Sequence, residues 1–324
     1  MLDIKISLCH LQGMKTLLRQ LGAAAEPTRL RLLALAAENE LCVAELTQIL
    51  RQSQPRLSRH LKLLADADLL ERTRDGSHVF FHVPDTPAGR LARMLLARIP
   101  DDDPTRLADR RQAARVVAER ARLASESFRR DKADWDELRA LRLPAAAIEA
   151  TLLAALPERL GRVLDIGTGT GRMLEVLAPR AEALAGVDAS RAMLALARDR
   201  IARRKLRASV RLGDMYRLPF QARTFDTVTM QMVLHYADDP AAALAEAARM
   251  VAPGGTLAVV DLAPHEQAAM MRARAHVHPG FGDDSLAGWS AAAGLQPHPA
   301  VPVQGPLEVR VWCAARAPVT EIVR

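Results

Sequence analysis

The chain has 324 residues, of which 49% are hydrophobic and 26% charged, and its formal net charge is +7. One hydrophobic core rarely organises a chain of this length, so we expect a globular protein with two domains and a connector. No apolar run approaches the about 20 residues that cross a bilayer, and the N-terminus lacks the pattern of a secretory signal, so we expect no membrane segment and a cytoplasmic location.

Cysteine usage and charge set two further expectations. The three cysteines, Cys9, Cys42 and Cys313, are too few and too far apart for a disulfide framework or a clustered zinc site. We therefore expect reduced thiols and no metal. The positive charge favours a polyanionic partner, although abundant arginine and alanine can also reflect a GC-rich genome. Only the local placement of the charges separates these two explanations.

The chain begins with a region of weak pattern. Residues 1–13 have no convincing period and are predicted to be a loose extension, whereas a cleaner helical pattern starts at Met14. The next helix is predicted from Pro27 to about Glu38, because its leucines recur along one side and proline is tolerated in a first turn.

Two more helices and a hairpin follow. Helices are predicted over residues 43–50 and from Gln54. Residues 71–83 are predicted to form a hairpin, because the alternating apolar strand VFFHV, residues 79–83, follows a turn centred on Asp75-Gly76. Such a dipeptide accepts a positive φ at low cost. Three helices and a β-wing constitute a winged helix-turn-helix.

Residues 26–83 resemble the ArsR family of winged-helix repressors. The resemblance implies that the helix from Gln54 is the recognition helix, with Leu57, Leu61 and Leu64 facing the core. The polar residues between them would contact bases and phosphates in the major groove, and two wing arginines would reach the backbone or minor groove. The predicted DNA-binding residues are Ser53, Gln54, Arg56, Ser58, Arg59, His60, Lys62, Arg72 and Arg74. The alternative is an ordinary amphipathic helix with a solvated face.

The resemblance also bears on metal binding and on assembly. ArsR sensors often bind metal through a Cys-x-Cys segment. Here ELCVAEL keeps Cys42 but has Ala44 where the second cysteine would stand, and a single thiol does not form that metal site. Repressors of this type bind near-palindromic DNA as dimers, with recognition helices about 34 Å apart, so we expect a homodimer. Two apolar stripes are candidates for its interface, and each can equally be part of a domain core: Leu17, Leu18 and Leu21, and Leu91, Leu95 and Leu96.

A charged segment follows the first domain. An acidic break at residues 101–104 precedes a stretch to about Leu141 in which both charge signs mix, a pattern typical of an exposed helix with i,i+4 pairs. The predicted domains are a winged helix-turn-helix at 14–100, a helical linker at 101–144 and a second domain at 145–324.

From Arg162 onward short apolar strands alternate with helices, which predicts a parallel sheet covered on both faces. The first strand runs into a glycine-rich turn in VLDIGTGTG, residues 163–171, where the backbone can approach a ligand closely. The residue three after Gly169 is Arg172, so the dinucleotide fingerprint is missing. Asp165, before the glycines, instead suits a ligand with an ammonium group.

Three companions support a ligand site, since a glycine turn alone can also serve strand-helix packing. Asp188 ends the second strand, where a carboxylate can accept hydrogen bonds from both hydroxyls of a ribose. Asp214 follows the third strand and can accept from the amino group of adenine, while the Met215 N–H meets a ring nitrogen. A Pro-Gly-Gly turn then leads into a fifth strand.

Residues 145–316 resemble a class I S-adenosylmethionine (SAM) methyltransferase domain, through VLDIGTGTG, GVDAS, GDMYRLPF, FDTVTMQMVLHYADDP and MVAPGGTLAVVD in the family's order. The resemblance implies a Rossmann-like α/β fold with a seven-stranded, mostly parallel sheet whose last strand, at 307–317, is antiparallel. It also implies that SAM, or S-adenosylhomocysteine (SAH) as product or effector, is bound, with Asp165 at the methionine part, Asp188 at the ribose and Met193 on the adenine. The implied cofactor residues are Asp165, Gly167, Thr168, Gly169, Gly171, Asp188, Ala189, Ser190, Met193, Gly213, Asp214, Met215 and Gln231.

The methyl acceptor is expected at the segments after the fourth and fifth strands. The candidate catalytic residues there are His235, Tyr236, His276 and His278, with His265 as a further residue of the pocket. For each histidine the alternative is a solvated loop position. A soft or ionised acceptor needs little help from a base, because positioning supplies much of the acceleration.

Two acceptor classes are disfavoured. Arsenic methyltransferases share the fold but use several cysteines, and this domain has only Cys313. The N/D-P-P-Y/F signature of many nucleic acid and protein amino-group methylases is replaced by VLHYADDP, so a small-molecule acceptor is predicted. Two hypotheses fit the intact motifs: a regulator that methylates a small molecule, and a sensor that binds SAM or SAH without turnover.

Overall fold

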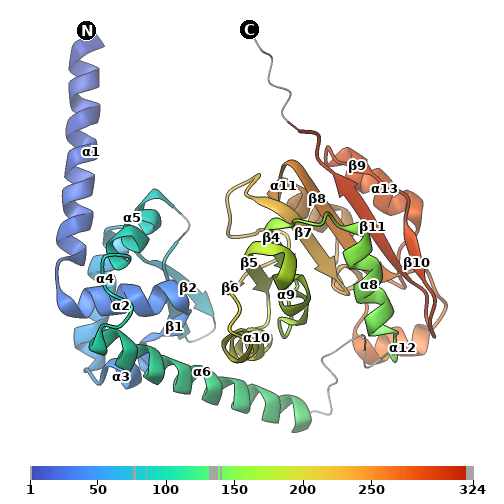
Figure 1. The fold of residues 1–324 in the computed structure, drawn as a ribbon, viewed down its shortest axis with the longest axis horizontal. Coiled ribbons are helices and arrows are strands. Elements are labelled where there is room, and N and C mark those ends of the chain that lie inside the picture. Colours follow the sequence, from blue (N-terminus) through green and yellow to red (C-terminus); the bar gives the residue numbers. More distant parts are fainter. Residues whose placement is uncertain (1, 76–77, 85, 131–137, 139–140, 319–324) are drawn as a thin grey trace. The chain divides into compact units, whose positions relative to one another are not determined.

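The computed structural model describes all residues except 1, 76–77, 85, 131–137, 139–140 and 319–324. Contacts divide the chain into two compact units, residues 1–117 and 118–324 (Figure 1). The predicted domain boundaries at 100 and 144 remain predictions. The long helix α6 (Pro104–Arg130) begins in the first unit and ends in the second.

The first unit contains helices and one small sheet. Its elements before α6 are α1 (Leu2–Ala24), α2 (Pro27–Glu38), β1 (Leu41–Cys42), α3 (Val43–Leu50), α4 (Gln54–Asp66), β2 (Glu71–Asp75), β3 (His78–His82) and α5 (Pro87–Leu96). The three strands pair antiparallel in the order β1-β3-β2. The predicted helices over 27–38 and 43–50 and the predicted hairpin are confirmed, and the tip of the hairpin lies outside the described residues.

The prediction that residues 1–13 form a loose extension is wrong, because α1 is helical from Leu2. Helix α1 contains no proline, and its glycines, Gly13 and Gly22, each destabilise a helix by only about 1 kcal/mol. The helical pattern from Met14 therefore continues backwards to the start of the chain.

The core of the first unit is formed by α2, α3 and α4. Leu57, Leu61 and Leu64 on α4 are buried, at i, i+4 and i+7, against the leucines of α2 and Leu46 of α3. This stripe leaves the other side of α4 exposed, as the sequence predicts.

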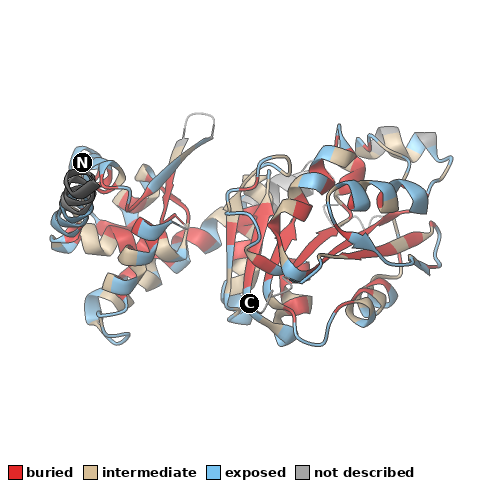
Figure 2. Ribbon diagram, turned by 90° about the horizontal axis from the view of Figure 1, so that it is seen from above, coloured by how far each residue is buried: buried red, intermediate tan, exposed pale blue. Residues whose placement is uncertain are grey.

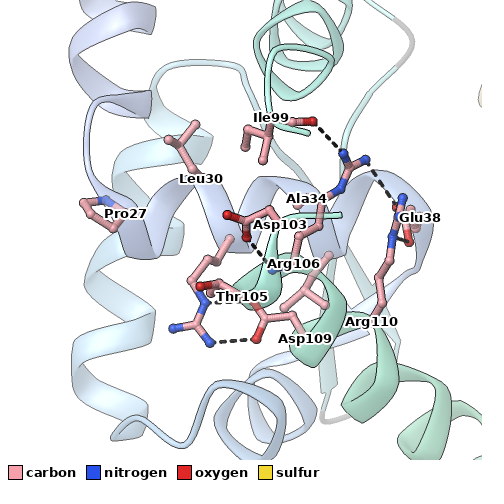
Figure 3. Close-up of a pocket in the computed structure, with 12 residues that line it drawn as sticks. Pro27, Leu30, Ala34, Glu38, Ile99, Asp103, Thr105, Arg106, Asp109 and Arg110 are labelled. Carbon is pink, nitrogen blue, oxygen red and sulfur yellow. Dashed lines mark hydrogen bonds and ion pairs between the residues drawn. The ribbon is translucent and has the colours of Figure 1, made fainter. Parts of the chain in front are cut away.

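Ion pairs hold the first turns of α6 against α2 (Figure 3). Arg31 donates from Nε and Nη2 to the two carboxylate oxygens of Asp109, at 2.7 Å each, and Arg110 pairs with Glu38. Asp103 caps the helix by accepting from the Arg106 N–H at 2.8 Å. The helices enclose a cavity of about 220 Å³ with a largely apolar floor that includes Pro27, Leu30, Ala34 and Ile99.

The second unit is an α/β domain. It contains α8 (Ala145–Ala155), β4 (Gly161–Ile166), α9 (Arg172–Leu177), η1 (Ala178–Arg180), β5 (Ala181–Asp188), α10 (Arg191–Arg204), β6 (Ala208–Leu212), β7 (Phe225–Gln231), η2 (Leu234–Tyr236), α11 (Pro240–Met250), β8 (Val251–Leu262), α12 (Ala268–Arg274), α13 (Asp283–Ala292), β9 (Gln296–Pro297), β10 (Val301–Val303) and β11 (Val309–Ala315).

One sheet in the order β10-β11-β8-β7-β4-β5-β6 runs through this unit. The strands β4 to β8 pair parallel, and β11 pairs antiparallel with β8, which confirms the predicted mostly parallel sheet and its antiparallel last strand. The sheet has one strand beyond the expected seven, because the chain after α13 returns along the end of β11 and forms the two-residue β9.

Helices cover both faces of this sheet, as predicted. In β4, Val163 joins the core with α8, α9 and α10, whereas Leu164 and Ile166 join the core with α11 and α13. The buried residues therefore gather on the strands (Figure 2). The carboxyl ends of β4 to β8 lie at one edge of the sheet, where ligands of such folds bind.

We expect Asp109→Asn to lower the free energy of unfolding of the first unit by about 1–3 kcal/mol, because it breaks a largely buried, bidentate ion pair. Chemical denaturation followed by far-ultraviolet circular dichroism measures this change. Glu119→Gln, which removes the exposed pair with Arg122 on the same helix, is the control and should have no measurable effect. Equal stability of Asp109→Asn and the wild type would contradict the structural role of this pair.

Candidate functional site

The glycine turn after β4 is bound to the neighbouring strand β5. The N–H groups of Gly167 and Thr168 both donate to the Val187 carbonyl, at 2.8 and 2.9 Å. Gly169 has φ +52° and open space where a side chain would stand. At this position the backbone itself forms the surface that a ligand would meet.

The residues predicted to bind the cofactor come together around one cavity of about 700 Å³. All of them except Gly171 line it. Gly171 has φ +75°, and a Cβ there would come within 3.2 Å of the Ala197 side chain on α10. This glycine therefore permits close packing of α9 on α10, and we leave it out of the proposed cofactor residues.

Asp165 is buried at the base of the cavity with an exposed fraction of 1%. Its Oδ1 accepts from the Thr229 hydroxyl at 2.7 Å, whereas its Oδ2 is buried without a hydrogen-bond partner. Burial, together with the charge of Asp188, raises the pKa of Asp165 from 3.8 to about 6, against the lowering effect of the Thr168 and Thr229 hydroxyls. A buried acceptor oxygen without a donor is suited to an ammonium group of a ligand.

Asp188 connects three parts of the cavity wall. Its two carboxylate oxygens accept from the N–H groups of Gly169 and Ser190, at 2.8 Å each. Burial raises its pKa, and these two backbone hydrogen bonds oppose the rise. Because each oxygen has a second lone pair, the carboxylate can hold the turn and still accept from a diol.

The predicted adenine residues lie where the chain leaves β6. Asp214 is exposed at the cavity and accepts from the Tyr216 N–H at 3.0 Å. Met193 on α10 and Met215 line the cavity and are half-buried. The three carboxylates Asp165, Asp188 and Asp214 therefore stand at the carboxyl ends of three successive strands, β4, β5 and β6, around one space.

The four candidate catalytic residues form one cluster, but only Tyr236 lines the cavity. The His235 ring is fully buried, with its Nδ1 2.6 Å from Oδ1 of Asp261, which is also fully buried at the end of β8. Asp261 also accepts from the N–H groups of Leu234, His235 and Leu262. This pair fixes the loop after β7 to β8.

The segment 276–278 covers the other side of this loop. The His276 and Tyr236 rings lie 4.1 and 4.3 Å from the His235 ring, between centroids. The carbonyl of His235 accepts from the N–H of His278 at 3.1 Å, and His278 Nε2 lies 2.9 Å from the Ala237 carbonyl. Burial and the charge of His235 lower the pKa of His265 nearby. The histidines thus support the wall behind Tyr236.

Several residues of the cavity were not predicted from the sequence. They come from segments outside the recognised motifs, namely Leu138, Ala145, Glu149, Arg172, Met173 and Arg200. A spacing signal existed only for Arg172, which stands directly after the glycine turn.

A second candidate surface lies on the first unit. All the predicted DNA-binding residues are exposed, on or just before α4 and on β2, except His60. The His60 side chain is only 13% exposed, and its Nδ1 lies 3.7 Å from Oε2 of Glu26, the N-cap of α2. His60 therefore faces the protein, and we leave it out of the proposed DNA-binding surface.

Comparison with protein families matches each unit to one family. Residues 26–72 match the family "Bacterial regulatory protein, arsR family", and residues 164–259 match the family "Methyltransferase domain". The chain joins an ArsR-family helix-turn-helix to a class I SAM methyltransferase domain. A methyltransferase domain implies the use of SAM.

Relatives of the methyltransferase domain include enzymes named for quinone methylation. The chain is 40% identical over 120 residues to demethylmenaquinone methyltransferase of Roseiflexus castenholzii, covering 36% of this chain and 50% of the relative. It is 35% identical over 106 residues to a ubiquinone/menaquinone biosynthesis C-methyltransferase of Geobacter sulfurreducens, covering 31% and 41%. The chain thus spans about half the length of these relatives or less.

Solved structures similar to the chain include two methyltransferases. A SAM-dependent methyltransferase from Aquifex aeolicus aligns with a TM-score of 0.46 at 21% identity, over 56% of this chain and 98% of that one. Magnesium protoporphyrin IX methyltransferase from Synechocystis, solved with bound SAH, aligns with a TM-score of 0.43 at 18% identity, over 53% and 81%.

Two further kinds of feature are absent from the described residues. No group of three or more His, Cys, Asp or Glu side chains there could hold a metal ion. No helix in that part of the chain is long and apolar enough to span a membrane. Cys42 and Cys313 are buried thiols.

We expect Asp165→Asn to stabilise the ligand-free methyltransferase domain. A folded-state pKa near 6 against 3.8 means that ionised Asp165 destabilises the fold above about pH 6, by up to about 3 kcal/mol, and that this cost disappears as the pH falls toward 4. The variant should therefore unfold at a higher temperature than the wild type at pH 7, with a difference that shrinks on acidification.

Calorimetric unfolding across this pH range measures the effect. Asp226→Asn is the matched control, because Asp226 lies at the start of β7, at the opposite edge of the sheet, and is exposed. A pH-dependent rise of the unfolding temperature in Asp226→Asn, or no such rise in Asp165→Asn, would contradict the destabilising role of the buried carboxylate.

Proposed function

We propose that this protein is a DNA-binding transcription regulator whose methyltransferase domain binds SAM in the cavity of about 700 Å³ and methylates a small molecule. One observation carries the proposal: carboxylates at the carboxyl ends of three successive parallel strands and the glycine turn line the same space. Each of these groups suits a different part of SAM.

The proposed roles follow from the chemistry of each wall. Asp165, with its unpartnered buried Oδ2, would accept from the ammonium of the methionine part. Asp188 would accept from the ribose hydroxyls, and Asp214 with the Met215 N–H would bind the edge of the adenine. Bound SAM supplies an electrophilic methyl group.

The acceptor would lie beside Tyr236. The adjoining lining residues Leu138, Ala145, Met232 and Val233 are apolar, which favours an acceptor with an apolar body. The relatives named for demethylmenaquinone and ubiquinone methylation are consistent with a ring compound of this kind. Within the proposal, Tyr236 contacts the acceptor, and the His235–Asp261 pair, with His276 and His278, holds Tyr236 in place.

A metalloid acceptor is disfavoured by the state of the thiol in this domain. Cys313 lies in the core, and burial raises the pKa of its thiol to about 11. A thiol that stays protonated near neutral pH is a poor ligand for a soft metal or metalloid. A small organic acceptor remains the better-supported proposal.

For the ArsR-family unit we propose sequence-specific binding of double-stranded DNA by a homodimer in the cytoplasm. The side chains Met14, Leu17, Leu18 and Leu21 on α1 are exposed at helical i, i+3, i+4 and i+7 spacing. The alternative stripe on α5 instead packs in part into the core, where Leu96 is buried. The α1 stripe is therefore the proposed dimer interface.

A second function, a sensor that binds SAM or SAH without turnover, is favoured by one observation. The buried histidines His235 and His276 lie behind the cavity wall, where they do not line the space that would hold an acceptor. In this case SAM and SAH must bind with different affinities to the DNA-competent and DNA-incompetent states. The helix α6 is proposed to transmit the difference, because it continues from one unit into the other.

The deciding experiment measures two quantities on the purified full chain: release of SAH from SAM in the presence of cell extract, and affinity for DNA with SAM, SAH or neither. Release of SAH supports the enzyme, whereas DNA affinity that differs between SAM and SAH without release supports the sensor. Absence of both effects would overturn the proposal.

The control for this experiment is Asp188→Ala. We expect it to weaken SAM binding by about 1–3 kcal/mol, the scale of hydrogen bonds to a charged group, in isothermal titration calorimetry. SAH release and the effect of SAM or SAH on DNA affinity should both decrease in this variant if they depend on the proposed site. Unchanged affinity would contradict the placement of the ribose.

On the DNA side we expect Arg59→Ala to weaken binding to a duplex enriched from a random library by about 1–3 kcal/mol, because Arg59 is exposed on α4. Fluorescence anisotropy at several salt concentrations measures both the loss and its salt dependence. Arg90→Ala, an exposed arginine on α5, is the control. Equal losses in the two variants would indicate a non-specific charge effect.

A further inference from the structure

Five charged side chains from three helices meet at one end of the methyltransferase cavity. Arg172 at the start of α9 donates from Nε and Nη2 to both oxygens of Glu149 on α8, at 2.8 Å each. Glu175 on α9 lies 2.9 Å from Arg204 Nε, 3.8 Å from Arg200 Nε and 3.9 Å from Arg172 Nη1. The cluster therefore contains three arginines and two glutamates.

Only part of this cluster reaches the cavity. Arg172 and Arg200 line it, whereas Arg204 does not. Among the residues that the structure describes, these two arginines are the only cationic side chains of the lining. The other charged lining residues are the carboxylates Glu149, Asp165, Asp188 and Asp214.

We propose that Arg172, with Arg200, binds the carboxylate of the amino-acid part of the ligand, so that the cavity selects nucleosides that carry an amino acid over those that do not. This inference rests on the proposed SAM site. SAM and SAH carry both an ammonium and a carboxylate on the same carbon, so their site needs an acceptor and a cation close together. Asp165 precedes and Arg172 follows one glycine turn, and both line the cavity, so this part of the wall supplies both groups.

Charge also sets the direction in which the amino-acid part binds. Buried Asp165 attracts the ammonium and repels the carboxylate, which turns the carboxylate toward the guanidinium groups. Glu149 contacts the Nε–Nη2 edge of Arg172 and holds the plane of its guanidinium. A guanidinium has five N–H donors, so Arg172 can hold Glu149 and a second carboxylate together.

The experiment compares the dissociation constants of SAH and of 5′-methylthioadenosine, measured by calorimetry on the full chain. Methylthioadenosine keeps the adenosine and the thioether but lacks the amino-acid part. We expect Arg172→Ala to weaken SAH about ten- to a hundredfold, the range for a hydrogen bond to a charged group, and to leave methylthioadenosine unchanged. Arg200→Ala should raise the ratio of the SAH to the methylthioadenosine dissociation constant as well, by a smaller factor.

Arg204→Ala is the matched control, because Arg204 contacts the same Glu175 without lining the cavity. The ratio of its dissociation constants for SAH and methylthioadenosine should equal that of the wild type. Arg172→Lys keeps the charge and tests folding, and it should bind SAH better than Arg172→Ala. If both nucleosides bind the wild type and neither Arg172→Ala nor Arg200→Ala changes the ratio, only the role of the arginines is overturned. If the wild type binds neither nucleoside, the proposed SAM site is overturned with it.

Discussion

The architecture of the second unit depends on one constraint of parallel sheets: strands that run the same way end at the same edge. Asp165, Asp188 and Asp214, at the carboxyl ends of β4, β5 and β6, are 23 and 26 positions apart in the sequence, yet their carboxylates share a cavity. The buried carboxylate of Asp165 makes this edge unfavourable for the ligand-free fold and favourable for a cation. A group that destabilises the empty protein and attracts a ligand is typical of a functional site.

The histidine-rich region after β7 and β8 shows a different use of polar residues. Asp261 receives hydrogen bonds from three backbone N–H groups as well as its contact with His235, so it organises two loops at once. Such a network holds a wall in place without entering the cavity. In the proposed function this network would separate the residues that contact the acceptor from those that position them.

Elements with strong local signals could be predicted from the sequence. Pro27 and Pro240 stand at first turns capped by Glu26 and Asp239, and the helix from Pro27 has the predicted bounds. Contacts between distant segments could not be predicted in this way. The burial of His60 depends on Glu26 from another helix, Gly171 is needed because Ala197 packs against it, and the Glu149–Arg172 pair joins two helices that no motif connects.

The opening turns of the long helix α6 have a consequence within the first unit. They complete the ArsR-family unit through Asp103, Asp109 and Arg110, so the boundary between the two units falls within α6. An insertion of one residue between Asp103 and Asp109 would turn the Asp109 side chain by about 100° about the helix axis, away from Arg31. The register of these turns against α2 is therefore set by the ion pairs, and single-residue changes in this stretch should cost the first unit more stability than changes farther along the helix.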